Sequence, residues 1–199
     1  MNPPRRLVLA LLLLIGVFLA AAGVMRLAGS RVAAPRSPSP TPAGRALPRA
    51  PDMAITMYQG ETAVGGRMVR LSQLWARKPV VVNFFAGLCA PCRAEMPDFQ
   101  RLSAQPGYDR FILISVDLGP YTGLGTREEG KALLRTLGIT YPAGTVFDED
   151  VVDGYQVVGM PTTVFITTQG RILRKHVGLL TYEQMSTFTA ELLQVSGRR

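Results

Sequence analysis

The two cysteines of this chain, Cys89 and Cys92, lie between a sequence typical of a buried strand and a sequence typical of a helix. The preceding segment Val80–Phe85 is rich in apolar and β-branched residues, as in a central strand covered on both faces. The following stretch puts both thiols at a helix N-terminus, where unpaired backbone N–H groups and the helix dipole stabilise a thiolate. Such settings lower a cysteine pKa from about 8.5 to roughly 3.5–7.5. The arrangement predicts an α/β fold with a nucleophilic, redox-active thiol pair.

Three other uses of a cysteine pair are compatible with the spacing alone. A structural zinc site usually needs four Cys or His ligands. The chain has only three such residues, its two cysteines and His176, which disfavours zinc. A purely structural disulfide across two residues would stabilise the fold little, because the entropy that it removes grows with loop length. Two buried, inert thiols are the third alternative. The downstream segment Gly159–Thr163, Gly-Met-Pro-Thr-Thr, favours the redox interpretation.

The formal net charge of +8 is concentrated in the first quarter of the chain. Residues 1–51 contain seven arginines and no acidic residue, which leaves 15 of the 22 Lys and Arg residues to balance 14 Asp and Glu. The folded part is therefore nearly neutral, and the high net charge implies no basic face on it. We expect no nucleic-acid partner.

An uncharged run of nineteen residues, Leu7–Met25, is bracketed by arginines. As a helix it would be about 28 Å long, close to the hydrocarbon thickness of a bilayer. We therefore predict that residues 1–26 form an uncleaved signal anchor with one transmembrane helix in the inner (cytoplasmic) membrane. A cleaved signal peptide is the alternative, since Ala20–Ala22 offers small residues to a peptidase. The flanking arginines nearly balance, and we expect the catalytic domain outside the cytoplasm because thiol–disulfide chemistry suits an oxidising compartment.

Residues 27–51 are rich in Ala, Pro, Arg and Ser and contain six prolines. Such a segment cannot bury enough apolar surface to fold, and its prolines keep it extended. It is predicted to be a flexible linker between the anchor and the folded part. Residues 52–199 then form one domain, with enough chain for a well-buried core.

Strand-like and helix-like segments alternate within residues 52–199. The expected strands are an N-terminal hairpin, a second central strand and a C-terminal hairpin, at Ala54–Tyr58, Met68–Leu71, Phe111–Val116, Thr162–Thr167 and Arg171–Val177. The expected helices cover residues 72–75, 91–104 with an interruption at Pro97, 126–138 after a Thr126–Glu129 capping box, and 182–195. This order predicts a mixed β-sheet flanked by helices.

Together these segments resemble the thioredoxin fold, and more closely the membrane-anchored TlpA/ResA/DsbE-like thiol-disulfide oxidoreductases. The resemblance rests on Val81–Pro97 with its Cys-Ala-Pro-Cys, on Gly159–Thr163 and on Gly170–Ile172, and it covers about residues 52–195. Residues 120–143 resemble the helix-containing central insertion of the same family. Leu88 departs from the family, which usually carries a tryptophan before the first cysteine. The resemblance implies a thioredoxin-like domain with an N-terminal hairpin and this insertion.

The resemblance also implies roles for the residues around the cysteines. Cys89, usually the exposed cysteine, is the expected nucleophile, and Cys92 would resolve the mixed disulfide. Glu95 resembles the family's active-site acid, which would move protons to and from Cys92. Its alternative role is that of a solvated acid in the first helical turn. The residues expected to bind substrate are Leu88, Pro91, Met160, Pro161 and Thr162.

Pro161 is implied to follow a cis peptide bond, although only about 5–6% of X–Pro bonds are cis. Such a bond would aim the backbone of Met160 at a bound peptide, which could pair with it as an added strand. Asn83 stands where thioredoxin carries a buried aspartate; otherwise it is a polar residue at a strand end. His176 is expected at the surface of the hairpin, and Trp75 is expected to pack at the edge of the domain.

The implied function is that of an extracytoplasmic thiol:disulfide oxidoreductase that reduces disulfides of exported proteins such as apocytochrome c. It would need no cofactor besides the Cys89–Cys92 disulfide, draw electrons from a membrane thiol donor and act as a monomer. A peroxiredoxin-type peroxidase is rejected, because its Pro-x-x-x-Thr/Ser-x-x-Cys pattern meets Val82 and Ala86 here. The alternatives are copper delivery and a redox-silent interaction protein. Copper(I) favours thiolates plus imidazole, and this chain has one histidine.

Overall fold

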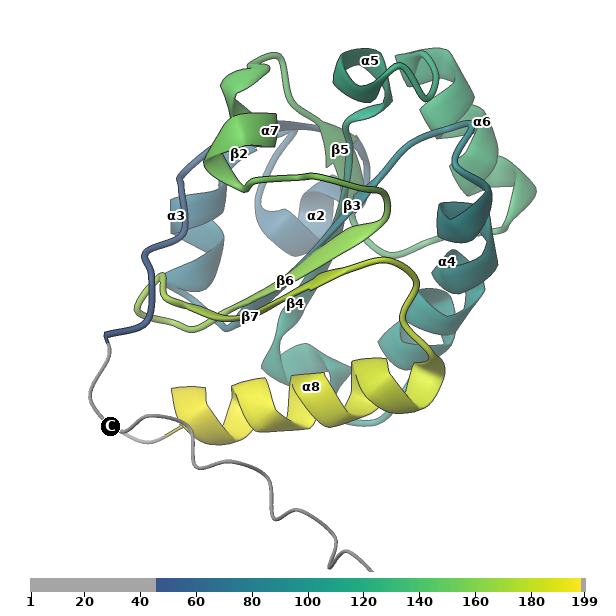
Figure 1. Ribbon diagram of the computed structural model, residues 1–199. Coiled ribbons are helices and arrows are strands. Elements are labelled where there is room, and N and C mark those ends of the chain that lie inside the picture. The colour runs from purple at the N-terminus through teal and green to yellow at the C-terminus, as the bar shows by residue number, and fades with distance from the viewer. Residues whose placement is uncertain (1–45, 198–199) are drawn as a thin grey trace, which may run out of the picture. The chain divides into compact units, whose positions relative to one another are not determined.

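Among residues 46–197, which this computed structural model describes, seven strands form one mixed sheet in the order β2-β1-β5-β4-β3-β6-β7 (Figure 1). The strands are β1 (Ala54–Gln59), β2 (Met68–Arg70), β3 (Val80–Phe85), β4 (Ile112–Asp117), β5 (Ala143–Thr145), β6 (Thr162–Ile166) and β7 (Ile172–Val177). The helices are α2 (Glu61–Val64), α3 (Leu71–Trp75), α4 (Ala90–Ser103), α5 (Gly119–Thr122), α6 (Arg127–Thr136), α7 (Asp150–Gly154) and α8 (Tyr182–Ser196), with a 3-10 turn at Tyr108–Arg110. The predicted mixed α/β sheet with flanking helices is confirmed.

The strand before the cysteines, β3, lies near the centre of the sheet. It pairs in parallel with β4 and antiparallel with β6, and all six of its side chains are buried. Because successive side chains of a strand point to opposite faces, Val80, Val82 and Phe84 join one core while Val81 and Phe85 join the other. The predicted central strand is confirmed, and its C-terminal end delivers the chain directly to the cysteines.

Two sets of helices cover the two faces of the sheet. One core contains residues of α2, α3 and α7, among them Val64 and Leu74. The other contains residues of α4, α6 and α8, among them Phe99, Leu133 and Met185. The helix that carries the cysteines, α4, is therefore packed between the sheet and the solvent, with α8 and α6 as its neighbours on the same face.

Helix boundaries follow the predicted signals at two places and depart from them at one. Thr126 and Glu129 form the predicted capping box of α6: Thr126 Oγ1 accepts from Glu129 N at 3.2 Å, and the Glu129 carboxylate accepts from Thr126 N at 2.7 Å. The backbone at Gly138, just past α6, has a φ of 63°, as expected of a glycine that ends a helix. In contrast, α4 continues through Pro97 instead of being interrupted there.

Strand β5 and the short helices α2, α5 and α7 were not predicted. Helices of four or five residues complete little more than one turn, which leaves no periodicity to detect. Strand β5 has the sequence Ala-Gly-Thr, yet it joins the N-terminal hairpin to the rest of the sheet by pairing with both β1 and β4. A Cβ at Gly144 would lie 2.5 Å from Thr56 O, so the glycine permits this close pairing.

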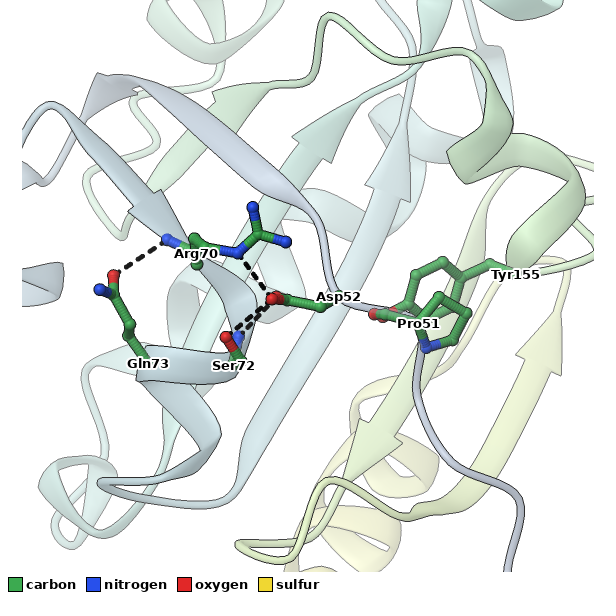
Figure 2. Close-up of polar contacts among 6 residues, drawn as sticks. All are labelled: Pro51, Asp52, Arg70, Ser72, Gln73 and Tyr155. Atoms are coloured by element: carbon green, nitrogen blue, oxygen red, sulfur yellow. Dashed lines mark hydrogen bonds and ion pairs between the residues drawn. The ribbon is translucent and has the colours of Figure 1, made fainter.

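Residues 46–51, assigned above to the linker, lie against the folded domain. Ala50 N donates to Gly170 O at 2.9 Å, and Ile172 N donates to Pro48 O at 2.8 Å. Tyr155 OH donates to Pro51 O at 2.5 Å (Figure 2). The folded unit therefore begins near residue 46 and not at residue 52.

Asp52 fastens this N-terminal segment to β2 and α3 (Figure 2). Its Oδ2 accepts from Arg70 Nε at 2.7 Å and from Ser72 Oγ at 2.8 Å, and its Oδ1 accepts from Ser72 N at 2.8 Å. Ser72 N is one of the unpaired donors at the start of α3, so Asp52 caps that helix. Partial burial opposes ionisation of the carboxyl, but the bonds from Arg70 and Ser72 outweigh it and lower the pKa of Asp52.

The predicted signal anchor, residues 1–26, and most of the predicted linker lie outside the described residues. Within residues 46–197, no helix is both long and apolar enough to cross a bilayer. The anchor remains a prediction from the sequence.

Candidate active site

Cys89 and Cys92 form a disulfide at the N-terminus of α4, with their Cα atoms 5.3 Å apart. Cys89 is the N-cap residue, and its Sγ accepts a hydrogen bond from Cys92 N at 3.2 Å. This donor and the dipole of α4 would stabilise a thiolate on Cys89 once the disulfide is opened. Cys92 is fully buried and Cys89 is 4% exposed. The first cysteine is thus the more accessible one, but the disulfide form covers it more than we expected of an exposed nucleophile.

Glu95 projects from α4 into the core and is 1% exposed. Its Oε1 accepts from Asn83 Nδ2 at 2.7 Å, and its Oε2 accepts from Leu180 N at 3.0 Å. Burial raises the pKa of Glu95 to about 7, although both hydrogen bonds oppose the rise. The alternative of a solvated acid is therefore wrong. A carboxyl with this pKa can take up and release a proton near neutral pH.

Behind Glu95, a buried polar network joins β3, β4 and β6. Asn83 Nδ2 also donates to Thr163 Oγ1 at 3.2 Å, and Ser115 Oγ lies 3.1 Å from both Asn83 Oδ1 and Tyr141 Oη. Asn83 is therefore the centre of this network and not merely a polar strand-end residue. Thr163 was noted only as the end of the Gly159–Thr163 segment, and Ser115 and Tyr141 were not singled out from the sequence, where the only signal is a polar residue within or beside an apolar run.

The segment expected to bind a peptide precedes β6. The Met160–Pro161 peptide bond is cis, as the resemblance implied. Pro161 and Thr162 are buried: Pro161 O accepts from Gly178 N at 2.8 Å, and Thr162 Oγ1 donates to Gly159 O at 2.7 Å. Met160 is half-buried and packs against the same core as the two cysteines.

Two of the predicted substrate-binding residues flank the cysteines at the surface. The side chain of Leu88 is 62% exposed although it is apolar, and Pro91 is also exposed. An exposed leucine next to a redox-active cysteine offers a substrate an apolar contact. Thr162, in contrast, is fully buried, so its side chain holds the loop through Gly159 and presents no surface to a substrate.

Trp75 packs as expected, whereas His176 is less exposed than the surface position that the sequence predicted. Trp75 is 6% exposed and packs against Gly170, where an added Cβ would lie 2.9 Å from the indole ring. His176 lies half-buried on β7, with its ring centroid 6.4 Å from that of Phe188. No group of three or more His, Cys, Asp and Glu side chains within residues 46–197 is placed to hold a metal ion.

Residues 48–175 match the AhpC/TSA family. The chain belongs to this family. It is 31% identical over 143 residues to the thiol-disulfide oxidoreductase ResA of Oceanobacillus iheyensis, covering 72% of this chain and 70% of that protein. It is 36% identical over 138 residues to the thiol:disulfide interchange protein DsbE homologue of Paracoccus denitrificans, covering 67% and 70% of the two chains. This family member is a thiol-disulfide oxidoreductase, as the cysteine pair predicted.

The thioredoxin-like fold of the oxidoreductase is confirmed by solved structures. A putative thiol:disulfide interchange protein DsbE from Chlorobium tepidum superimposes with a TM-score of 0.61 over 75% of this chain and 98% of that chain, at 24% identity. A putative protein disulfide isomerase from Bacteroides thetaiotaomicron gives a TM-score of 0.57 at 27% identity, covering 75% of this chain and 91% of that one.

Proposed function

We propose that this oxidoreductase reduces disulfides of exported proteins, with apocytochrome c as one such substrate, on the outer side of the cytoplasmic membrane. The observation that carries the proposal is the Cys89–Cys92 pair at the start of α4, backed by the buried carboxyl of Glu95. This arrangement supplies a nucleophile, a resolving thiol and a proton acceptor on one helix. The exposed Leu88 beside the pair supports a protein and not a small molecule as substrate.

The proposed reaction starts from the dithiol form. The Cys89 thiolate attacks one sulfur of the substrate disulfide, so that a mixed disulfide forms and the other substrate sulfur leaves as a thiolate. The Cys92 thiolate then attacks Cys89 Sγ, which releases the second substrate sulfur and restores the Cys89–Cys92 bond. The substrate has gained two electrons and, after protonation, two thiols. A membrane thiol donor returns the two electrons to the enzyme by the same exchange in reverse.

Glu95 is the proposed proton acceptor for the second attack. Cys92 is buried and must lose its proton before it can displace the substrate. Residues three apart in a helix lie on one face, and Cys92 and Glu95 are both buried on the same face of α4. With a pKa of about 7, the carboxyl is partly ionised at neutral pH and can both take the proton and release it.

Substrate binding is proposed to involve the surface around Leu88 and Pro91 together with the backbone of Met160. An extended peptide that adds to this loop as a strand would bring its disulfide to Cys89. Backbone pairing discriminates little between sequences, which suits an enzyme that meets several unfolded or partly folded exported proteins.

The direction of electron flow is proposed to be reduction of the substrate. A strong oxidant needs a strongly stabilised thiolate form, and the two residues between the cysteines, Ala90 and Pro91, carry no cation or imidazole. We expect a reduction potential closer to about −270 mV than to about −120 mV, the values of a reducing thioredoxin and of a strong oxidant. A potential near the upper value would overturn this part of the proposal.

Substrate trapping in the full-length protein tests the proposed function. A Cys92→Ser variant should stall as a mixed disulfide on Cys89 and capture exported cysteine-containing proteins in adducts that a reductant releases. The matched control is Cys89→Ser, which keeps one thiol but removes the nucleophile and should capture none. Equal capture by both variants, or no reduction of insulin by the dithiol form, would favour a copper-delivery or redox-silent protein instead.

A further inference from the structure

A second buried carboxyl, Asp117, lies at the end of β4 and takes no part in the reaction described above. It is fully buried and pairs in register with Phe85, the last residue of β3. Residues 86–89, between β3 and α4, are called the active-site loop below. Its Oδ1 accepts from Gly119 N at 2.9 Å, and its Oδ2 accepts from Tyr58 OH at 3.0 Å. A buried carboxylate with two donors is held in one place, so the segments packed against it are held as well.

The first of these segments is residues 119–125, at the start of the central insertion. It extends from Asp117 to Leu88, the residue before Cys89. Gly119 packs so closely that an added Cβ would lie 3.0 Å from Asp117 Oδ1 and 2.8 Å from Gly125 O. An added Cβ at Gly125 would lie 3.2 Å from Leu88 Cγ. Leu88 N, in turn, donates to Leu124 O at 2.8 Å. Residues 119–125, which lead into the insertion, thus touch Asp117 at one end and Leu88 at the other.

The second segment is the beginning of α6. An added Cβ at Gly130 would lie 2.1 Å from Asp117 Oδ2, so the carboxylate rests directly on the helix backbone. An added Cβ at Gly87 would lie 2.5 Å from the carbonyl carbon of Glu129 and 2.6 Å from Gly130 N. Asp117 and Gly87 therefore lie against the same turn of α6, at Glu129 and Gly130. In a close-packed interior, a shift of one of these groups displaces its neighbours, because there is no void to absorb the shift.

We propose that Asp117 is a positioning residue whose carboxylate holds the central insertion against the active-site loop, and that its protonation moves Leu88 and changes the reactivity of Cys89. The inference rests on the proposed role of Cys89 as nucleophile. Protonation removes the charge of the carboxylate and turns one of its oxygens into an O–H donor, so the bonds from Gly119 and Tyr58, which favour the charged form, are weakened.

The groups that face Asp117 come from several elements. Tyr58 of β1 donates to it, the charges of Arg127 and Glu128 of α6 act on it, and Lys131 Nζ lies 5.0 Å from the Tyr58 ring centroid. Burial raises the pKa of Asp117 to about 6, while the bonds from Gly119 and Tyr58 and the charge of Arg127 lower it. The switch between the two forms therefore falls within the range of pH that a compartment outside the cytoplasm can reach.

The amide signal of Leu88 in the oxidised full-length protein, followed by NMR against pH, tests the inference independently of turnover. Neither cysteine titrates in the disulfide form. We expect a step near pH 6 in the wild type, no step in Asp117→Asn, and a retained step in the control variant Glu95→Gln. Tyr58→Phe removes a hydrogen bond that favours the carboxylate, so its step should move to higher pH. If Asp117→Asn shows the same pH-dependent step of the Leu88 amide signal as the wild type, the inference is overturned. If Asp117→Asn does not fold, a step in Tyr58→Phe at the wild-type pH overturns it.

Alkylation of Cys89 in the reduced protein supplies the second readout. Asp117→Asn should change the alkylation rate at pH 7.5 by roughly 2- to 30-fold, the range typical of residues that act through an intervening network. An unchanged rate in a folded variant would contradict the link to Cys89. If Leu88 and Cys89 respond as expected while the Cys92→Ser variant captures no exported protein, the proposed substrate fails and the positioning role of Asp117 stands.

Discussion

Replacing Glu95 by Gln should stabilise the oxidised protein in a way that depends on pH. In the folded state the carboxyl has a pKa of about 7 in place of the usual 4.5, so the native protein holds its proton where the unfolded chain has lost it. The contribution of Glu95 to the free energy of unfolding is fully present below pH 4.5. It falls as the pH rises from 4.5 to 7 and does not change further above pH 7. At about 1.4 kcal/mol per pH unit, the loss amounts to about 3 kcal/mol. A Gln side chain cannot ionise, so the Glu95→Gln variant does not lose this stability as the pH rises.

A Gln side chain fits this site best if Asn83 turns its amide, which reverses its bonds to the Thr163 and Ser115 hydroxyls. Gln offers one acceptor where Glu95 offers two, to Asn83 Nδ2 and Leu180 N, and a reversed Asn83 would present its oxygen to the new amide. Urea unfolding of the disulfide forms at pH 4 to 8 measures the difference directly. The advantage of Glu95→Gln over the wild type should grow by about 3 kcal/mol between pH 4.5 and pH 7.5. A difference that does not vary with pH would refute the claim that the buried carboxyl ionises near neutral pH.

Three further substitutions separate the packing of the active-site loop from its chemistry. Gly87→Ala should lower the free energy of unfolding by about 1–3 kcal/mol, because its Cβ would meet the α6 backbone at 2.5 Å; a melting temperature equal to that of the wild type would contradict this contact. Leu88→Ser, at an exposed position, should leave the melting temperature unchanged but raise KM for a protein disulfide; an unchanged KM would remove Leu88 from the substrate surface. Thr126→Ala should cost about 1 kcal/mol through loss of the α6 cap, as urea unfolding would report, and no loss would mean that the capping box is not needed.

The strand, the cysteines and the start of α4 could be predicted because they are contiguous in sequence. The apolar, β-branched residues of β3 indicate a buried strand, and the cysteines follow this strand after three residues. The boundary of the folded domain could not be placed from composition. Pro48 and Pro51 suggest a linker. However, Pro48 O and Ala50 N form hydrogen bonds with Ile172 and Gly170, more than a hundred residues away in the sequence.

The sequence of α4 carries a signal for the buried position of Glu95. Cys92, Glu95, Met96 and Phe99 repeat at intervals of three and four residues, and all four are buried on one face of α4. The network behind Glu95 had no such signal. Its members come from β3, β4, β6 and the segments before β5 and α8, and only the folded chain brings them together.

The central claim is that α4 makes Cys89 a thiolate near neutral pH, and the rate of its alkylation in the reduced wild-type protein tests this most directly. Measured against pH with iodoacetamide, the rate should rise with a midpoint below the value of about 8.5 for a free cysteine, within roughly 3.5–7.5. A midpoint at or above 8.5 would mean that the helix terminus does not activate the thiol, and it would contradict the account.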